Sequence, residues 1–501
     1  MNRDFSKRIW ILLWICLILI NVIMRIPVTP HEIGHDSFLE HFIADSLSNY
    51  GHAKWWLHPL SIVGLYPFSI ASALPFYLSG VSQSLSLGME WTIWVCLLFL
   101  GIFSSFTAYL MAGAIKDDKL FKFITALVYS TSPGILLFTT WSASGRGLLL
   151  VFLPLFIYLL IKSRFYKVKY SFLVFVLFLF ILATHNLYYI TIPIILGYLV
   201  VVVSKNFQIR SSNLFGNILL ILLFVTFYTQ FTISKVSIIT LIEGYGRYIG
   251  LFGLFAIGGF IFLLFNNDKT LEEKFVIMVL FFLLPAIGIM TYSKFFMLPF
   301  EAILASYGIV NLITISQKRN AGLFILLILT VFSIGFAEYF QFGRTNIEGE
   351  SQGAIFWAED STVNAAQWTG SYANKMVFTD GISLSRRLLA YSGVNMFTEN
   401  DIVYAIQDDL GDFNVSMRSP SSLLFYSEGP FEVVNRTGMN SWAWYKIVDE
   451  GLDSRWAWIV QNIDINYYVR DERFDTAFSR SFRDRSKLYD TGKISIWDFK
   501  R

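Results

Sequence analysis

Repeated apolar segments, each about as long as a membrane is thick, constrain the fold of this chain more than any other feature. Runs of roughly 18 to 25 residues with few charges recur along the first two thirds of the sequence. The longest extends from Tyr170 to Ser204, too long for one ordinary span, and the polar triplet at residues 184–186 is the natural place to divide it. Because a helix satisfies its own backbone hydrogen bonds in lipid, these runs predict membrane-spanning helices.

The composition agrees with a membrane protein. Only 15% of the 501 residues are charged, against roughly 25% in a soluble protein, and the mean hydropathy is +0.55. The formal net charge of +3 is small and by itself says nothing about nucleic acid. We expect no nucleic-acid partner. Cys16 and Cys96 lie inside apolar runs, which argues against a disulfide framework.

We predict an α-helical polytopic protein of the cell membrane with about eleven spans. They are expected near residues 8–26, 90–115, 119–138, 145–163, 168–184, 186–204, 213–234, 246–266, 272–292, 296–315 and 320–340. Segment 60–85 contains Pro67 and Pro75 with Gly64 and Gly80, and we expect it to be interfacial or re-entrant.

The positively charged segments predict the orientation of these spans. With eleven crossings, one face carries the basic residues before the first span and the segments 162–169, 204–210 and 316–319. Positive segments stay on the cytoplasmic side. We therefore expect a cytoplasmic N-terminus, an extracytoplasmic C-terminal region and all six histidines on the outer face.

The composition changes sharply after Phe340. Residues 341–501 are rich in charge and tryptophan and contain no apolar run long enough to span a membrane. A helix is predicted to start near Asp360, and alternating polarity predicts strands at 465–471 and 493–499. We therefore divide the chain into a transmembrane domain, 1–340, with a first outer loop at 27–85, and an extracytoplasmic soluble α/β domain, 341–501.

The first outer loop concentrates titratable residues beside the membrane. Five of the six histidines lie between residues 31 and 58. His31-Glu32-Ile33-Gly34-His35 matches the H-E-x-x-H pattern, in which two histidines one helical turn apart bind zinc and the glutamate acts as a base. This leaves a zinc membrane metalloprotease as one alternative.

Several features favour a structural role for the H-E-x-x-H residues. Thr29, Pro30 and Glu32 fit a helix start with an N-cap, a first-turn proline and a capping-box partner. The pattern resembles that of intramembrane site-2 proteases, which also require an Asp-Gly pair in an apolar span. The one Asp-Gly pair, Asp380-Gly381, lies in the predicted soluble domain.

From Asp36 onward the loop has the pattern of an amphipathic helix lying on the outer membrane surface. Glu32, Asp36 and Glu40 are spaced one turn apart on its polar side. The apolar side consists of Phe38, Leu39, Phe42, Ile43 and Leu47. Such a helix would hold Asp36 at the boundary between water and lipid; the alternative is an interfacial helix with merely hydrated carboxylates.

Beyond Asp36 the sequence resembles the C-type (GT-C) superfamily of polytopic membrane glycosyltransferases, distantly including the catalytic subunit of oligosaccharyltransferase. The resemblance rests on Asp36, Gly51, Trp55-Trp56 and Tyr66-Pro67, which follow the first span in the family's order. It implies that Asp36 is the catalytic base or a metal ligand. It adds two segments: Lys294 to Pro299, whose cation would hold a lipid-linked phosphate, and Thr240-Leu-Ile-Glu243, similar to an outer-loop glutamate motif.

The resemblance implies transfer of a sugar, with inversion, from a polyprenyl or dolichyl phosphate to a glycan, lipid or protein acceptor on the outer face. Cations at the outer ends of spans would offset the charge of the leaving phosphate. The candidate site residues are Asp36, Glu32 and His35 for catalysis, Arg146, Lys294, Arg247 and His185 for the donor phosphate, and Glu243 and Glu40 for substrate or metal.

The cofactor expected from the resemblance is a divalent cation, Mg²⁺ or Mn²⁺, with Asp36 as a ligand, whereas zinc belongs to the protease alternative. The sequence departs from oligosaccharyltransferase in two places. The second outer loop, WSASGRG at 141–147, has Ser144 and Arg146 in place of an acidic pair, and the Trp-Trp-Asp acceptor motif is absent. A non-enzymatic transporter or lipid-binding protein is a further alternative, although no internal repeat favours it.

Overall fold

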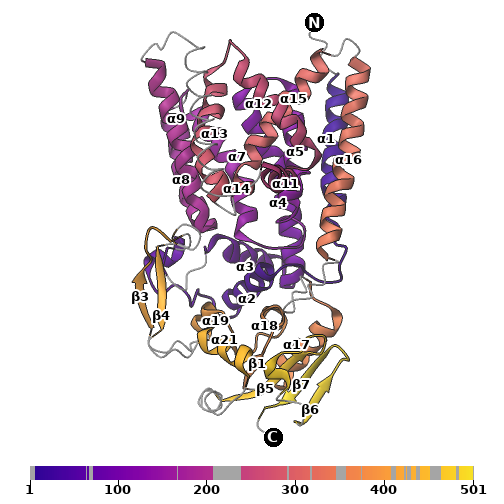
Figure 1. Ribbon diagram of the computed structural model, residues 1–501, viewed down its shortest axis with the longest axis vertical. Helices are drawn as coiled ribbons and strands as arrows, with labels where there is room; N and C mark the ends of the chain where they lie inside the picture. Colours follow the sequence, from indigo (N-terminus) through magenta and orange to yellow (C-terminus); the bar gives the residue numbers. More distant parts are fainter. Residues whose placement is uncertain are drawn as a thin grey trace.

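Figure 1 shows the computed structural model, a bundle of long helices followed at one end by a smaller α/β region. The structure describes residues 6–63, 65–66, 71–165, 167–206, 238–289, 293–315, 319–345, 357–373, 375–407, 413–422, 425, 430–435, 441–451, 464–480 and 485–499. The span predicted at 213–234 lies outside these residues, as do Gly64 and Pro67.

The bundle confirms a multi-pass helical membrane protein. In the described part of the chain, five helical segments are long and apolar enough to cross a membrane: Met89–Ile115, Gly145–Ser163, Asn186–Val203, Glu243–Phe265 and Phe324–Gln341. Two shorter apolar helices, Val168–Thr184 and Leu298–Thr314, accompany them. The total of eleven spans and the orientation of the termini stay predictions.

The helices of the bundle follow the predicted apolar runs closely. They are α1 (Lys7–Ile23), α4 (Met89–Ile115), α5 (Lys119–Ser130), α6 (Pro133–Leu136), α7 (Gly145–Ser163), α8 (Lys167–Thr184), η2 (Asn186–Ile190), α9 (Thr191–Asn206), α11 (Ile238–Ile249), η3 (Gly250–Phe252), α12 (Gly253–Phe265), α13 (Leu271–Ile289), α14 (Ser293–Phe296), α15 (Leu298–Ile315) and α16 (Arg319–Thr345). The span predicted at 119–138 is wrong in its length, because α5 ends at Ser130 and Pro133 begins the separate helix α6.

Helices α12 and α15 make the closest approach in the bundle. A Cβ added at Gly259 would lie 1.8 Å from the carbonyl oxygen of Leu304, and one at Gly308 would lie 2.3 Å from that of Phe255. Small residues let two membrane helices touch through their backbones. This contact fixes α15, which directly follows α14 in the chain, against α12.

Two helices of the first outer loop lie between the bundle and the α/β region (Figure 1). They are α2 (His35–Tyr50) and α3 (Ala73–Leu85), with the short helix η1 (Pro59–Val63) between them in sequence. Helix α3 is about 20 Å long at 1.5 Å per residue, too short to cross a membrane. This agrees with the prediction that segment 60–85 does not form a full span.

The apolar side of α2 packs on protein, not on lipid, so the prediction for that surface was wrong. Phe42, Ile43 and Leu47 share a buried core with Leu384 and Leu388 of the α/β region. A fully buried side chain of this kind contributes about 1.5–3 kcal/mol. The amphipathic helix starting near Asp36 is confirmed, but its apolar face joins two parts of the molecule.

The α/β region has a five-stranded mixed sheet with strand order β2-β1-β5-β7-β6. Strands β2, β1 and β5 are parallel, and β7 and β6 continue the sheet in antiparallel pairs. A separate antiparallel pair is formed by β3 and β4. The elements are α17 (Asp360–Tyr372), β1 (Met376–Thr379), α18 (Ile382–Ser392), β2 (Met396–Phe397), α19 (Asp401–Ile406), β3 (Phe413–Met417), β4 (Phe431–Asn435), α21 (Ser441–Glu450), β5 (Ile465–Asp471), α23 (Ala477–Arg480), β6 (Lys487–Asp490) and β7 (Ile494–Asp498). The predicted helix near Asp360 and both predicted strands are confirmed.

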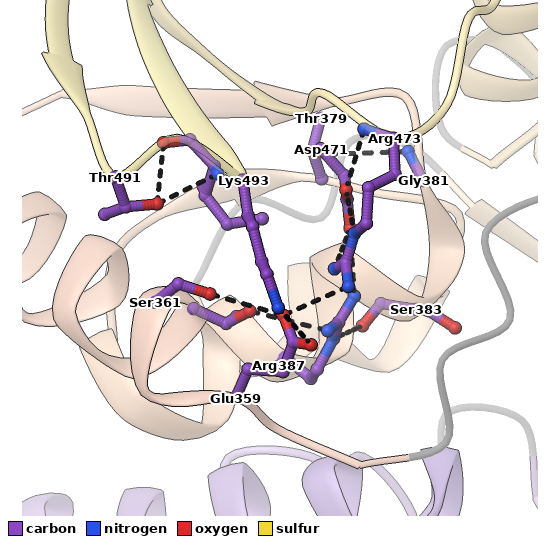
Figure 2. A network of polar contacts seen from close by, with 12 residues as sticks. Glu359, Ser361, Thr379, Gly381, Ser383, Arg387, Asp471, Arg473, Thr491 and Lys493 are labelled. Carbon is purple, nitrogen blue, oxygen red and sulfur yellow. Dashed lines mark hydrogen bonds and ion pairs between the residues drawn. The ribbon is translucent and has the colours of Figure 1, made fainter. Parts of the chain in front are cut away.

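A charged network fixes α18 against the sheet (Figure 2). Arg473 donates from Nε and Nη2 to the two carboxylate oxygens of Asp471, at 2.7 Å each, and lies 3.0 Å from Glu359 through Nη1. The fully buried Arg387 of α18 lies 3.7 Å from the same aspartate, and Lys493 pairs with Glu359 at 3.0 Å. The network thus ties α18, through Arg387, to Asp471 at the end of β5.

Candidate active site

The second outer loop is bound to the start of α2. The backbone N–H of Ile33 donates to the carbonyl of Trp141 at 2.9 Å, and that of Ala143 donates to Ser37 Oγ at 2.9 Å. Gly34, directly before α2, has φ +101°, and a Cβ there would lie 2.7 Å from Ser142 Oγ. These contacts carry the 141–147 segment to the first turn of α2.

The consequence is an ion pair between the two loops. Arg146 Nη2 donates to Asp36 Oδ2 at 2.7 Å, and the two side chains are 23% and 46% exposed. Asp36 lies in the first turn of α2 and Arg146 in the first turn of α7, which Ser144 caps. A helix N-terminus attracts anions, so Arg146 and the start of α7 present positive charge beside one reachable carboxylate.

His185 closes one side of this pair. A Cβ on Gly145 would lie 2.3 Å from the carbonyl oxygen of Thr184 and 3.4 Å from His185 Cδ2, so the two segments are in contact. His185 Nδ1 accepts from the backbone N–H of Leu187 at 3.1 Å. Burial, and then the charge of Arg146, lower the pKa of His185. The imidazole is therefore neutral and has Nε2 available as a donor.

Glu40 lies one turn beyond Asp36 on α2. It is 8% exposed, and its Oε2 has no hydrogen-bond partner among the described residues. Burial, and then the charge of Asp36, raise the pKa of Glu40 to about 8. Glu40 is consequently uncharged at neutral pH, and Asp36 is the carboxylate that pairs with Arg146.

A series of aromatic rings connects Arg146 to Lys294. The guanidinium lies 5.3 Å from the Phe138 ring, which is 5.1 Å from the ring of Phe295. Lys294 Nζ of α14 lies 5.6 Å from that same ring and 4.7 Å from the ring of Tyr248. The structure thus places these two cations on either side of two buried aromatic rings.

Glu243 and Arg247 are placed differently. They lie one turn apart on α11 and pair with each other at 3.5 Å, with side chains 66% and 53% exposed. Helix α11 packs against α6, α14 and α15. These two residues therefore lie near Lys294 through α14, and Glu243 pairs with its own arginine instead of with the residues around Asp36.

The H-E-x-x-H residues do not form the predicted helix start. Helix α2 begins at His35 with Gly34 as its N-cap, and Thr29 Oγ1 donates to the carbonyl of His31. The helix start predicted at Thr29 and Pro30 was wrong: residues 28–31 form bends, and a backbone bond ties the following Ile33 to Trp141. His31 and His35 are consequently not one helical turn apart.

The three ionisable groups of this motif have separate partners. His31 lies 2.9 Å from Glu90 and 3.0 Å from Asp360, and the hydrogen bond to Glu90 is the main cause of its raised pKa. The fully buried Glu32 accepts from Ser37 at 2.7 Å and pairs with His41 at 2.6 Å. Nowhere in the described residues do three or more His, Cys, Asp or Glu side chains form a group that would hold a metal ion.

His35 faces the α/β region. Its ring nitrogens both lie 3.2 Å from Ser383 Oγ at the start of α18. Burial, together with the charges of Arg386 and Arg387, lowers the pKa of His35 to about 4. A neutral imidazole thus stands directly before Asp36 in the chain.

Sequence reasoning missed Glu90, Tyr391 and Ser383, which join the first outer loop to other parts of the molecule. Glu90 Oε1 accepts from the backbone N–H of Glu32 and from the Tyr391 hydroxyl, at 3.1 Å each. A carboxylate at the start of a long apolar run was a usable signal for Glu90. Nothing local in the sequence marks the other two.

Comparisons with known proteins find the fold and no sequence relative. No protein-family model and no curated protein matches the chain. The apo structure of the Archaeoglobus fulgidus oligosaccharyltransferase matches with a TM-score of 0.64 at 10% identity, over 94% of this chain and 70% of that one. The same enzyme with zinc and sulfate matches with a TM-score of 0.62 at 11% identity, over 92% of this chain and 68% of that one. The complex of this enzyme, AglB, with an inhibitory peptide and a dolichol-phosphate matches with a TM-score of 0.62 at 11% identity, over 93% of this chain and 70% of that one.

This likeness confirms the predicted resemblance at the level of the fold. The chain shares the fold of this oligosaccharyltransferase.

Proposed function

We propose that this protein is a membrane glycosyltransferase that moves a sugar from a polyprenyl or dolichyl phosphate to an acceptor on the outer face of the membrane. The observation that carries the proposal is the pair of Asp36 and Arg146, which contact at 2.7 Å on the first turns of α2 and α7 and are both partly exposed. On a GT-C fold this pair offers a base for the acceptor beside a cation for the donor.

The donor phosphate is assigned to the positive side of the site. Arg146 and Lys294 flank the buried rings of Phe138 and Phe295. Arginine binds phosphate oxygens with two parallel hydrogen bonds, whereas lysine acts as a point charge. Support comes from the A. fulgidus enzyme, which has been solved with a dolichol-phosphate. Arg247, at the outer end of α11, is proposed to attract the donor phosphate from a distance through its charge.

The proposed reaction is a single displacement. A lone pair of the acceptor oxygen or nitrogen attacks the anomeric carbon, the bond from that carbon to the phosphate oxygen breaks, and its electron pair stays on the phosphate. The acceptor proton passes to Asp36, and the products are the glycosylated acceptor, with inverted configuration, and the polyprenyl phosphate. Arg146 and Lys294 offset the charge that develops on the phosphate, and Asp36 acts as the general base.

Three uncharged groups complete the proposed site. Glu40 holds its proton near neutral pH and so does not compete with Asp36 for the guanidinium. His185 and His35 are neutral as well, because burial lowers the pKa of each imidazole. They are proposed to donate hydrogen bonds without adding charge. Glu32 is assigned a positioning role, since its partners are Ser37 and His41.

The acceptor is proposed to reach Asp36 beside the contact between α2 and α18. His35 and Ser383 meet there, one residue before Asp36. The A. fulgidus enzyme has been solved with a tethered acceptor peptide that contains an NVT sequon, which supports a peptide among the glycan, lipid and protein classes. We assign residues 1–340 to the membrane domain and 341–501 to an extracytoplasmic domain that helps to form this contact, with the N-terminus in the cytoplasm.

The test is release of polyprenyl phosphate in proteoliposomes. Sugar-loaded dolichyl and polyprenyl phosphates, as mono- and diphosphates, are supplied with a sequon peptide or with an extract of surface glycans. We expect release from at least one donor, dependent on an acceptor. Zinc-dependent proteolysis, with no release of polyprenyl phosphate from any donor, would establish the metalloprotease alternative instead.

A further inference from the structure

The positive charge beside Asp36 comes from a side chain of the protein, that of Arg146. Arg146 Nη2 is 2.7 Å from Asp36 Oδ2, the distance of a charge-assisted hydrogen bond. A divalent cation bound by this carboxylate would have to share it with the guanidinium. Mg²⁺ and Mn²⁺ prefer a set of oxygen ligands, and a guanidinium supplies donors only.

Arg146 is held at this place by its surroundings. It lies in the first turn of α7, whose start is packed through Gly145 against Thr184 and His185. Its guanidinium also lies over the Phe138 ring at 5.3 Å. A stacked and paired arginine is pre-organised, with less side-chain freedom to lose than a free one. The side chain therefore keeps its charge beside Asp36.

Other carboxylates of the outer loops are committed to cationic partners of their own. Glu243 pairs with Arg247 at 3.5 Å, Glu90 with His31 at 2.9 Å and Glu32 with His41 at 2.6 Å. Glu40, the carboxyl closest to Asp36 along α2, is buried at 8% exposure. Asp36 has the guanidinium of Arg146 as its ion-pair partner, and this donor set does not fit a divalent cation.

We infer that Arg146 supplies beside Asp36 the positive charge that the fold's relatives would obtain from a divalent cation, so that this chain binds its lipid phosphate and transfers sugar without a metal. The inference rests on the proposed function. It replaces the Mg²⁺ or Mn²⁺ expected from the sequence, and it accounts for the arginine in the second outer loop where an acidic pair was expected.

The charge of Arg146 serves both substrates in this arrangement. The guanidinium is proposed to orient Asp36 toward the acceptor, while its positive charge attracts the leaving phosphate. A planar guanidinium has five donors in a fixed geometry, enough for both contacts. Removing it leaves Asp36 without its counter-charge and the phosphate without its bidentate partner.

The test measures metal and lipid binding separately on the detergent-solubilised full chain. Protein stripped with EDTA is titrated with MnCl₂ and followed by electron paramagnetic resonance. Dolichyl phosphate binding is measured in EDTA and in Mn²⁺. The variants are Arg146→Met, Asp36→Asn and, as a control at the opposite end of α7, Arg164→Met, whose partner is Glu272 at 3.2 Å.

We expect the wild type to hold no stoichiometric Mn²⁺ and to bind dolichyl phosphate equally well, within about twofold, in both buffers. Arg146→Met should weaken that binding by about tenfold or more, since a bidentate charged pair is lost, while Arg164→Met leaves it unchanged. One Mn²⁺ per chain that Asp36→Asn removes would overturn the inference, as would lipid binding that EDTA abolishes and Mn²⁺ restores. So would unchanged lipid binding by folded Arg146→Met. If the wild type binds no dolichyl phosphate in either buffer, the proposed function fails first.

Discussion

Ser383 Oγ lies 3.2 Å from the imidazole of His35, so that the α/β region closes over the residue directly before the candidate base. The contact spans 348 residues of sequence. It is supported by the apolar core that Phe42 and Ile43 of α2 share with Leu384 of α18. The candidate site is therefore built jointly by the outer loops and the C-terminal region.

Replacing Lys294 tests the donor side of the site. Its Nζ lies 4.7 Å from the Tyr248 ring and is linked to Arg146 through two further rings. Lys294→Met should weaken binding of dolichyl phosphate about fivefold to tenfold, and more strongly at low salt, because exposed charges are screened at high ionic strength. Lys122→Met, which removes a pair with Asp117, is the control. Equal affinities for both variants would show that Lys294 does not contact the phosphate.

Glu40 predicts a pH-dependent change in stability. Its pKa of about 8 lies above the ordinary 4.5, so the folded protein holds this proton more tightly than the unfolded chain does. The associated stabilisation is present below about pH 4.5 and is lost as the pH rises through 8. Glu40→Gln stays uncharged at every pH. Its melting temperature should match that of the wild type at pH 5 and exceed it by about 2 °C at pH 9; a difference independent of pH would contradict this assignment.

Gly34 tests the contact between the two outer loops. Both Gly34 and Gly51 have positive φ, but a Cβ at Gly34 would lie 2.7 Å from Ser142 Oγ, whereas one at Gly51 has no neighbour within 4 Å. Gly51→Ala should cost only the backbone strain of about 1–2 kcal/mol. Gly34→Ala should melt at a lower temperature and also lose sugar transfer, because it displaces the segment that carries Arg146. Equal losses in the two variants would rule out this coupling.

The buried pair of Glu32 and His41 should be important for stability. Burial opposes a charge on His41, but Glu32 and Asp45 outweigh it and raise its pKa to about 10. His41→Ala would leave Glu32, which is fully buried, without its cation, at a cost of about 3–5 kcal/mol. Thermal unfolding should show a large decrease for His41→Ala and little for His52→Ala, an exposed histidine of the same loop. Similar melting temperatures for the two would disprove the role of the pair.

Helices and strands whose apolar residues follow a regular local pattern were predictable from the sequence. The apolar runs gave α4, α7 and α16, and alternating polarity gave β5 and β7, because each pattern matches one geometry. The resemblance carried by Asp36 and its neighbours led to the correct fold. Those inferences depend on residues close together in the chain.

Relationships between distant segments were not predictable. Asp36 and Arg146 were both candidates, yet nothing in either loop indicated that they pair across 110 residues. The apolar side of α2 has the same pattern whether it meets lipid or α18. Local signals were also overridden at Thr29, where a good N-cap sequence forms bends instead of a helix and the nearby Ile33 bonds to Trp141. Tertiary contacts decided each of these cases.

The most direct test of the account compares Asp36→Asn with Asp45→Asn in the donor-release assay. Both substitutions remove a carboxylate from α2, and Asp45 lies 3.4 Å from His41 on the same helix, so each variant is first checked for intact thermal unfolding. We predict that Asp36→Asn slows sugar transfer by about 10²–10⁴-fold, the usual contribution of a general base, while Asp45→Asn retains the wild-type rate within about threefold. Transfer by folded Asp36→Asn at the wild-type rate would contradict the assignment of Asp36 as the base.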